Sequence, residues 1–184
     1  MITGAKTISK YRDFSNKKRV DFILKNYGSI GEYIRSYEEI LCDDILEQRA
    51  IERRIDKGDT GVRVQTSEKS DPTAMVAVDR VTLEERFSLD NDSDSFMCRD
   101  FEINRDARTL KIMKRDFKYV VHAMNMLSQH DRCALGEVLC HEKTLDTIAE
   151  EKGIQYESAK MYIYRNRLKV RTLALEFIES ACAC

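Results

Sequence analysis

The sequence predicts an all-α protein that ends in a helix-turn-helix, and three observations lead to this expectation. The 184 residues include one Pro, seven Gly and no Trp, while Leu, Ile, Glu, Lys and Arg are common, a composition that favours helices. Apolar residues recur at steps of three and four along most of the chain. Finally, residues 144–178 form the pattern of a short helix, a glycine-containing turn and a longer basic helix.

The N-terminal half predicts two helices after a loosely ordered start at residues 1–16. Residues 17–27 make a short amphipathic helix with Val20, Ile23 and Leu24 facing inward. Residues 29–57 form a long helix that resembles one arm of a coiled coil or a helical hairpin, with a structural role. Its apolar positions are Ile30, Tyr33, Ile34, Tyr37, Leu41, Ile45, Ile51 and Ile55.

The middle of the chain alternates polar loops with helices. Glycines and one proline punctuate a loop at 58–73, and Asp71-Pro72 starts a helix over 72–88. Its inward side chains are expected to be Met75, Val76, Val78, Val81, Leu83 and Phe87. The acidic stretch 90–95 is a linker, followed by helices over 96–126 and 128–141. We therefore expect an N-terminal oligomerisation or partner region at 1–95 and a second region at 96–184, with its helix-turn-helix core at 124–178.

Helix caps and spacing define the helix-turn-helix. Ser128 can cap a helix, with Asp131 three residues later as in a capping box. In the following short helix, Leu145, Ile148 and Ala149 share one face. Gly153 suits the positive φ that ends a helix, and Ser158 lies near the start of the longer one.

The longer helix is basic in a chain that is nearly neutral. Residues 152–178 hold six Lys or Arg and two Glu, whereas the whole chain has a net charge of −1. A local basic stripe of this kind is typical of contact with phosphates of double-stranded DNA, although a solvated amphipathic helix is the alternative. The residues expected to meet base edges or phosphates are Tyr156, Ser158, Lys160, Met161, Tyr164, Arg165, Arg167, Lys169 and Arg171.

Other classes of function lack a matching pattern. No apolar run approaches the roughly 20 residues that cross a bilayer, and no signal peptide is present, so we expect a cytoplasmic protein without membrane contact. The six cysteines form no CxxC pair; Cys133 and Cys140, two helical turns apart, are expected to be core thiols rather than metal ligands, and Cys182 and Cys184 to lie on a frayed tail. The three histidines pair with no evident nucleophile or acid, so we expect no catalysis and no cofactor.

Residues 124–178 resemble the C-terminal promoter-binding region of sigma-70-type transcription factors. The resemblance rests on Leu127-Ser128-Gln129, on Arg132, on the TLDTIA stretch at 144–149, and on Gly153-Ile154 followed by Arg165, Arg167 and Leu168. The chain departs from the family at Asp146, where Glu is common, and at Gln155-Tyr156, where Ser or Thr is usual. The resemblance implies a recognition helix that reads a DNA major groove.

The front half looks like sigma-like phage regulators of the ArpU and RinA type, mainly through the segment GVRVQTSEKSDPT at 61–73. The combined resemblance implies a sequence-specific transcription regulator of phage or prophage origin. It would act as a homodimer or through RNA polymerase. The alternative is a phage-encoded inhibitor of a host defence nuclease, of the anti-CRISPR type, whose acidic surfaces dock on a basic channel.

Overall fold

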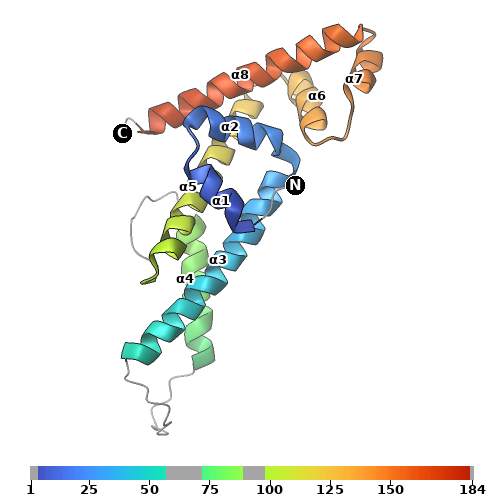
Figure 1. Ribbon diagram of the computed structural model, residues 1–184. Coiled ribbons are helices and arrows are strands. Elements are labelled where there is room, and N and C mark those ends of the chain that lie inside the picture. Colours follow the sequence, from blue (N-terminus) through green and yellow to red (C-terminus); the bar gives the residue numbers. More distant parts are fainter. Residues whose placement is uncertain (1–3, 57–71, 89–97, 183–184) are drawn as a thin grey trace. The chain divides into compact units, whose positions relative to one another are not determined.

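A computed structural model shows that the protein is all-helical (Figure 1), and it describes residues 4–56, 72–88 and 98–182. The expected loop at 58–73 therefore lies outside the described residues except for its last two positions, as do the acidic stretch 90–95 and Phe96. The described residues form eight helices: α1 (Gly4–Arg12), α2 (Asn16–Lys25), α3 (Tyr27–Asp56), α4 (Pro72–Ser88), α5 (Phe101–Asn125), α6 (Gln129–Leu139), α7 (Leu145–Lys152) and α8 (Tyr156–Cys182). None of them is both long enough and apolar enough to span a membrane.

The chain divides into two compact units, which we describe separately. Unit 1 comprises residues 1–34 and 112–184, and unit 2 comprises residues 35–111. The boundaries fall inside α3 and α5 rather than near residue 95, where the acidic stretch suggested a division. Sequence composition marks polar segments, whereas compactness depends on which helices pack together.

Unit 1 contains a helix that sequence periodicity did not predict. Residues 1–16 were expected to be loosely ordered, but α1 forms and buries Ile8 and Tyr11 completely. The Tyr11 ring lies edge-on to the ring of Phe22 in α2, with centroids 5.7 Å apart. Because only two of the described side chains of α1 lie in the core, its local pattern is weak and the helix depends on distant partners.

One of these partners is a buried carboxylate on α5. The hydroxyl of Tyr11 donates to Asp116 Oδ2 at 2.7 Å, and Arg19 Nε lies 3.2 Å from the same oxygen. Burial raises the pKa of Asp116, while the nearby Arg19 cation and the Tyr11 hydroxyl oppose that rise. This polar cluster joins α1, α2 and α5, and a buried charge of this kind is tolerated only when it is paired.

The predicted inward face of α2 is confirmed, since Val20, Ile23 and Leu24 are fully buried. A close approach lies at the start of α3, where a Cβ at Gly28 would come 3.1 Å from the backbone Cα of Cys140. A side chain at position 28 would therefore require the backbone at Cys140 to shift by a few tenths of an ångström. Cys140 itself is only half-buried and Cys133 is exposed, so the expectation of core thiols fails at Cys133.

In unit 2, ion pairs link α4 to α3. Asp79 of α4 pairs with Arg49 and Arg53 of α3, and Arg80 pairs with Asp43. Leu83 and Phe87 are buried on the same side of α4 as Asp79. The ion pairs and these two side chains determine which face of α4 is covered.

The predicted inward face of α4 is largely wrong. Met75, Val76, Val78 and Val81 are 45–66% exposed. The first turns of α4 are apolar around most of their circumference, so periodicity could not select a face. Near the end of α3, the expected core positions Ile51 and Ile55 are also exposed.

The start of α5 is set by a cap rather than by the apolar pattern. The carboxylate of Asp100 accepts a hydrogen bond from the backbone N–H of Ile103 at 3.0 Å. The helix therefore begins at Phe101, and not at residue 96. The buried amide of Asn104 donates to the carbonyl oxygen of Asp100 at 2.6 Å and further fixes this end.

Candidate nucleic-acid interface

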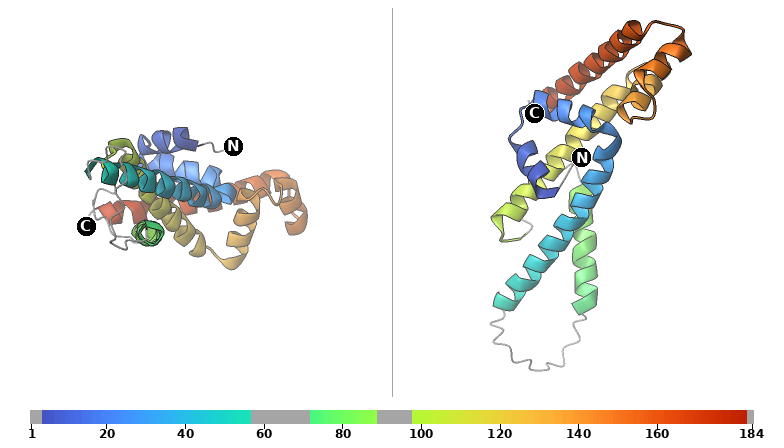
Figure 2. Two further views of the ribbon diagram at one scale, coloured as in Figure 1. Left: turned by 90° about the horizontal axis from the view of Figure 1, so that it is seen from below. Right: turned by 45° about the vertical axis from the view of Figure 1, so that its right-hand side comes forward.

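All the elements of the candidate interface belong to unit 1. Helices α2, α6 and α7 each contact α8 (Figures 1 and 2). In Figure 2, α7 lies beside the N-terminal end of α8. The sequence positions these short helices through their caps.

Both short helices begin with hydroxyl caps. Ser128 Oγ accepts a hydrogen bond from the backbone N–H of Asp131, which confirms the predicted cap of α6. Thr144 Oγ1 accepts from the backbone N–H of Thr147 and caps α7 in the same way. Each cap satisfies one of the donors that a helix start leaves unpaired.

The turn between α7 and α8 is a Schellman motif. Gly153 has a φ of 62°, in the left-handed region, as its position in the sequence predicts. The N–H of Ile154 donates to the carbonyl oxygen of Ala149 at 3.0 Å, and the N–H of Gly153 donates to that of Glu150 at 3.1 Å. The turn therefore has a single defined conformation. Helix α8 then begins at Tyr156, two residues before the expected start near Ser158.

One side of α8 is buried at helical spacing. The buried side chains recur at steps of three and four and are Ala159, Ile163, Asn166, Val170, Ala174 and Ile178. In α7, Ile148 and Ala149 are buried. Small Ala159 and Ala149 allow the backbones of two crossing helices to approach closely.

A polar clamp fixes the rotation of α8 about its own axis. We use this name for Asp131 of α6 with Tyr162 and Asn166 of α8. Asp131 Oδ1 accepts from the Tyr162 hydroxyl, and from Asn166 Nδ2 at 3.2 Å. These hydrogen bonds, together with one from Ser128, hold the pKa of Asp131 below its ordinary value. Burial and the carboxylate raise the pKa of Tyr162 to about 12.

This clamp was not predicted from the sequence, although one residue, Asn166, indicated it. Asn166 is only 2% exposed and lies within an otherwise apolar stripe, so a polar partner was required. The clamp extends to α7, because Lys152 Nζ lies 4.3 Å from the centre of the Tyr162 ring and 3.1 Å from His130 Nδ1. The three helices of the motif are thereby joined by polar contacts as well as by apolar ones.

The opposite side of α8 carries cations and large side chains. We call Lys160, Met161, Tyr164, Arg165, Leu168 and Lys169 the outer face of α8. All six are exposed, and Met161, Tyr164 and Leu168 keep 46%, 57% and 43% of their surface in contact with solvent. Lys160 has a weak partner in Glu157 at 3.4 Å, one helical turn away and exposed. The outer face therefore offers three positive charges beside aromatic and thioether surface.

The remaining residues of the expected site are distributed differently. Tyr156 and Ser158 are exposed in the first turn of α8. Arg167 is half-buried and lines a pocket beside α8. Arg171 forms an ion pair with Asp21 of α2, with its Nε 2.7 Å from Oδ1 and its Nη2 2.8 Å from Oδ2. The structure thus brings seven of the nine residues to open surface and gives Arg171 a partner within the protein.

No protein-family model, curated protein or solved structure matches this chain.

Proposed function

We propose that this protein is a sequence-specific DNA-binding transcription regulator of the sigma-like kind, of phage or prophage origin, acting in the cytoplasm. The observation that carries the proposal is the outer face of α8, which a capped helix and a defined turn present away from the buried stripe. In a helix-turn-helix, the second helix lies in the major groove and its N-terminal residues contact base edges.

The chemistry of the outer face divides between the two kinds of contact. Lys160, Arg165 and Lys169 supply point charges for phosphates, which set affinity and its salt dependence. Tyr156, Ser158, Met161 and Tyr164 lie in the first turns of α8, where side chains reach base edges and thymine methyl groups. We leave Arg171 out of the proposed interface, because its guanidinium is engaged by Asp21.

The first experiment is selection of bound fragments from random duplex DNA with the full chain. If the protein is a regulator, the selected fragments should share a consensus sequence. The affinity for a duplex with that sequence is then measured at several salt concentrations. The triple variant Lys160→Gln, Arg165→Gln, Lys169→Gln should flatten the slope of log K against log salt by about 2.7, since each phosphate contact contributes about 0.9.

The matched control is Lys10→Gln, Lys17→Gln, Lys18→Gln. It removes the same charge from exposed positions on α1 and α2. If the control lowers the slope as much as the outer-face variant, DNA attraction is diffuse and the proposed docking of α8 is wrong.

A homodimer would read two half-sites about one helical turn of DNA apart. The exposed apolar side chains of α4, Met75, Val78 and Val81, are the surface to which we assign the second copy. Val78→Asp should convert a dimer to a monomer in sedimentation equilibrium. A sedimentation profile unchanged by this substitution would move the dimer contact elsewhere.

A second candidate function is inhibition of a host defence nuclease, which the acidic surface of α3 favours. Asp43, Asp44 and Glu47 are exposed within two turns of that helix. Partial burial and the two neighbouring carboxylates raise the pKa of Asp44, so a basic partner surface would relieve this crowding. The inhibitor function predicts that selection from random DNA returns no consensus and that the purified chain captures a nuclease. Capture of an RNA polymerase subunit would instead support the regulator.

A further inference from the structure

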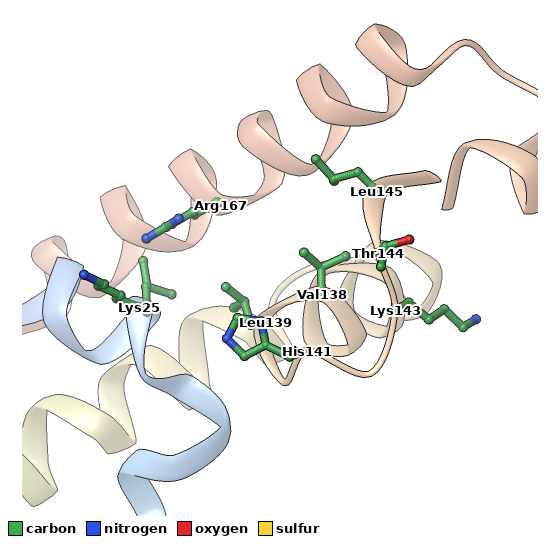
Figure 3. A pocket seen from close by; sticks show the side chains of 9 residues that line it. Lys25, Val138, Leu139, His141, Lys143, Thr144, Leu145 and Arg167 are labelled. Atoms are coloured by element: carbon green, nitrogen blue, oxygen red, sulfur yellow. The ribbon is translucent and has the colours of Figure 1, made fainter. Parts of the chain in front are cut away.

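A pocket of about 430 Å³ opens in unit 1 between α2, the segment joining α6 to α7, and α8 (Figure 3). This volume falls in the range of roughly 300–1,000 Å³ typical of small-molecule sites. The pocket is lined by Leu24, Lys25, Val138, Leu139, His141, Lys143, Thr144, Leu145 and Arg167. It does not belong to the outer face of α8, because none of the residues of that face lines it.

The lining combines an apolar part with positive charge. Val138, Leu139 and Leu145 supply the apolar surface, with the fully buried Leu24 behind it, and none of the nine described lining residues is acidic. Lys143 is neutralised by Glu137 at 3.2 Å and Glu151 at 2.7 Å, and Figure 3 shows its side chain extending away from the other side chains. The cations that remain to act on the pocket are therefore Lys25 and Arg167.

Lys25 and Arg167 come from different helices and share one end of the pocket. In Figure 3, Arg167 projects from α8 towards the α2 end, where Lys25 lies. Within the described part of the chain, no carboxylate forms an ion pair with either side chain. A guanidinium matches the two oxygens of a carboxylate or phosphate, and an ammonium adds a point charge. At the other end, Leu145 and Val138 line the pocket beneath α8 (Figure 3).

We propose that this pocket binds a small organic anion, in which a carboxylate or phosphate monoester is attached to an apolar body. The acidic head lies between Lys25 and Arg167, and the apolar body covers Val138, Leu139 and Leu145. The bound molecule would join α2 to α8 beside the Asp21–Arg171 ion pair and would thus stabilise the unit that carries the outer face. This site is additional to the proposed DNA contact and does not depend on it.

The test uses the full chain in titration calorimetry and thermal unfolding. The probes are octanoate, octyl phosphate, 1-octanol and inorganic phosphate, each below any micelle-forming concentration. Octanoate and octyl phosphate should bind and raise the unfolding temperature, and they separate the two head groups. Octanol lacks the charge and inorganic phosphate lacks the apolar body, so each should bind at least tenfold more weakly.

Variants locate the site. Lys25→Gln and Arg167→Gln should each weaken binding of the preferred probe at least tenfold, whereas Lys18→Gln, exposed on α2, should leave it unchanged. Leu145→Ala should also weaken octanoate binding. This variant tests the site if a charge variant proves too unstable to measure. The proposal is overturned if no probe binds, if inorganic phosphate binds as well as octyl phosphate, or if the Lys25 and Arg167 variants bind like the parent.

One further outcome would reassign the pocket. If Arg167→Gln lowers DNA affinity and its salt slope as much as Arg165→Gln does but leaves probe binding unchanged, Arg167 contacts a nucleic-acid phosphate and the ligand proposal is wrong. A chain that binds octanoate but selects no DNA consensus would support the pocket while rejecting the regulator. The two proposals can therefore fail independently.

Discussion

Removing a single hydroxyl from the polar clamp should loosen α8 without creating a cavity. The substitution Tyr162→Phe deletes the donor to Asp131 and keeps the aromatic ring that lies against Lys152. We expect the variant to fold to the same structure with a lower free energy of unfolding. The motif should be affected locally, because the clamp connects only α6, α7 and α8.

The size of the effect follows from the remaining partners of Asp131. A hydrogen bond to a charged group contributes about 1.5–3 kcal/mol, and partial exposure of the clamp reduces that value. Asp131 also keeps its bonds to Ser128, at 2.7 Å, and to Asn166, so the carboxylate is not left unpaired. We therefore expect a loss of about 1 kcal/mol, or a fall of about 2–4 °C in unfolding temperature.

The assay is thermal and urea unfolding followed by circular dichroism. The control is Tyr164→Phe, which makes the same chemical change on the exposed side of α8. It should leave stability within about 0.3 kcal/mol of the parent, as is usual for exposed surface changes. Equal stability of Tyr162→Phe and the parent, or equal losses in both variants, would refute the assignment of the clamp.

The clamp also predicts a pH dependence. Because the Tyr162 and Ser128 hydroxyls lower the pKa of Asp131 from its ordinary 3.8, the folded state favours the ionised form. The resulting stabilisation is present above the ordinary pKa and is lost as the pH falls through the lower folded value. The stability difference between the parent and Asp131→Asn should therefore stay constant from neutral pH down to about pH 5 and shrink at more acidic pH. A difference that grows on acidification would contradict this sign.

Three further predictions concern stability and DNA binding. Gly153→Ala should cost about 1–2 kcal/mol in urea unfolding through backbone strain alone, because nothing lies within 4 Å of the added methyl group. Gly28→Ala should lower the unfolding temperature, whereas Gly31→Ala, whose Cβ would meet only ordinary contacts at 3.8 Å, should leave it unchanged or raise it. Arg171→Met should reduce stability by no more than about 1 kcal/mol and leave the salt slope of DNA binding intact, while Arg165→Met should flatten that slope by about 0.9.

Local signals were sufficient where one helix face and its ends decide the structure. Val20, Ile23 and Leu24 are buried as their spacing predicts, and Gly153 adopts the conformation that its position requires. Ser128 caps α6 through the hydroxyl that the sequence singled out. In each case the determining contacts lie within a few residues of one another.

Prediction failed where partners distant in sequence decide the outcome. The helix α1 is held in place partly because Asp116, 105 positions after Tyr11, accepts a hydrogen bond from the Tyr11 hydroxyl. Arg171 looked like a phosphate ligand by charge alone, and its partner Asp21 is 150 positions away. In α4, the ion pairs of Asp79 with Arg49 and Arg53 of α3 help to determine which face is covered, together with the buried Leu83 and Phe87. Periodicity within one segment contains no information about such pairs.

The part of the candidate site that could be predicted is its open surface. Charge singled out Lys160 and Arg165, and its place near the start of the helix singled out Tyr164; the structure leaves all three exposed to solvent. The support behind these residues, provided by Asp131 and Asn166, became visible only once α6 and α8 were seen together.

The unit that holds α8 is assembled from residues 1–34 and 112–184, with residues 35–111 lying between them in the chain. During translation α1 and α2 emerge before α8, the helix against which α2 packs. The apolar surface of α2 that packs on α8 therefore stays exposed until α8 is made, and transiently exposed apolar surface is prone to aggregation. A nascent chain that stops before α8 would lack the outer face of α8, so under the proposed function only chains that include this helix would bind DNA.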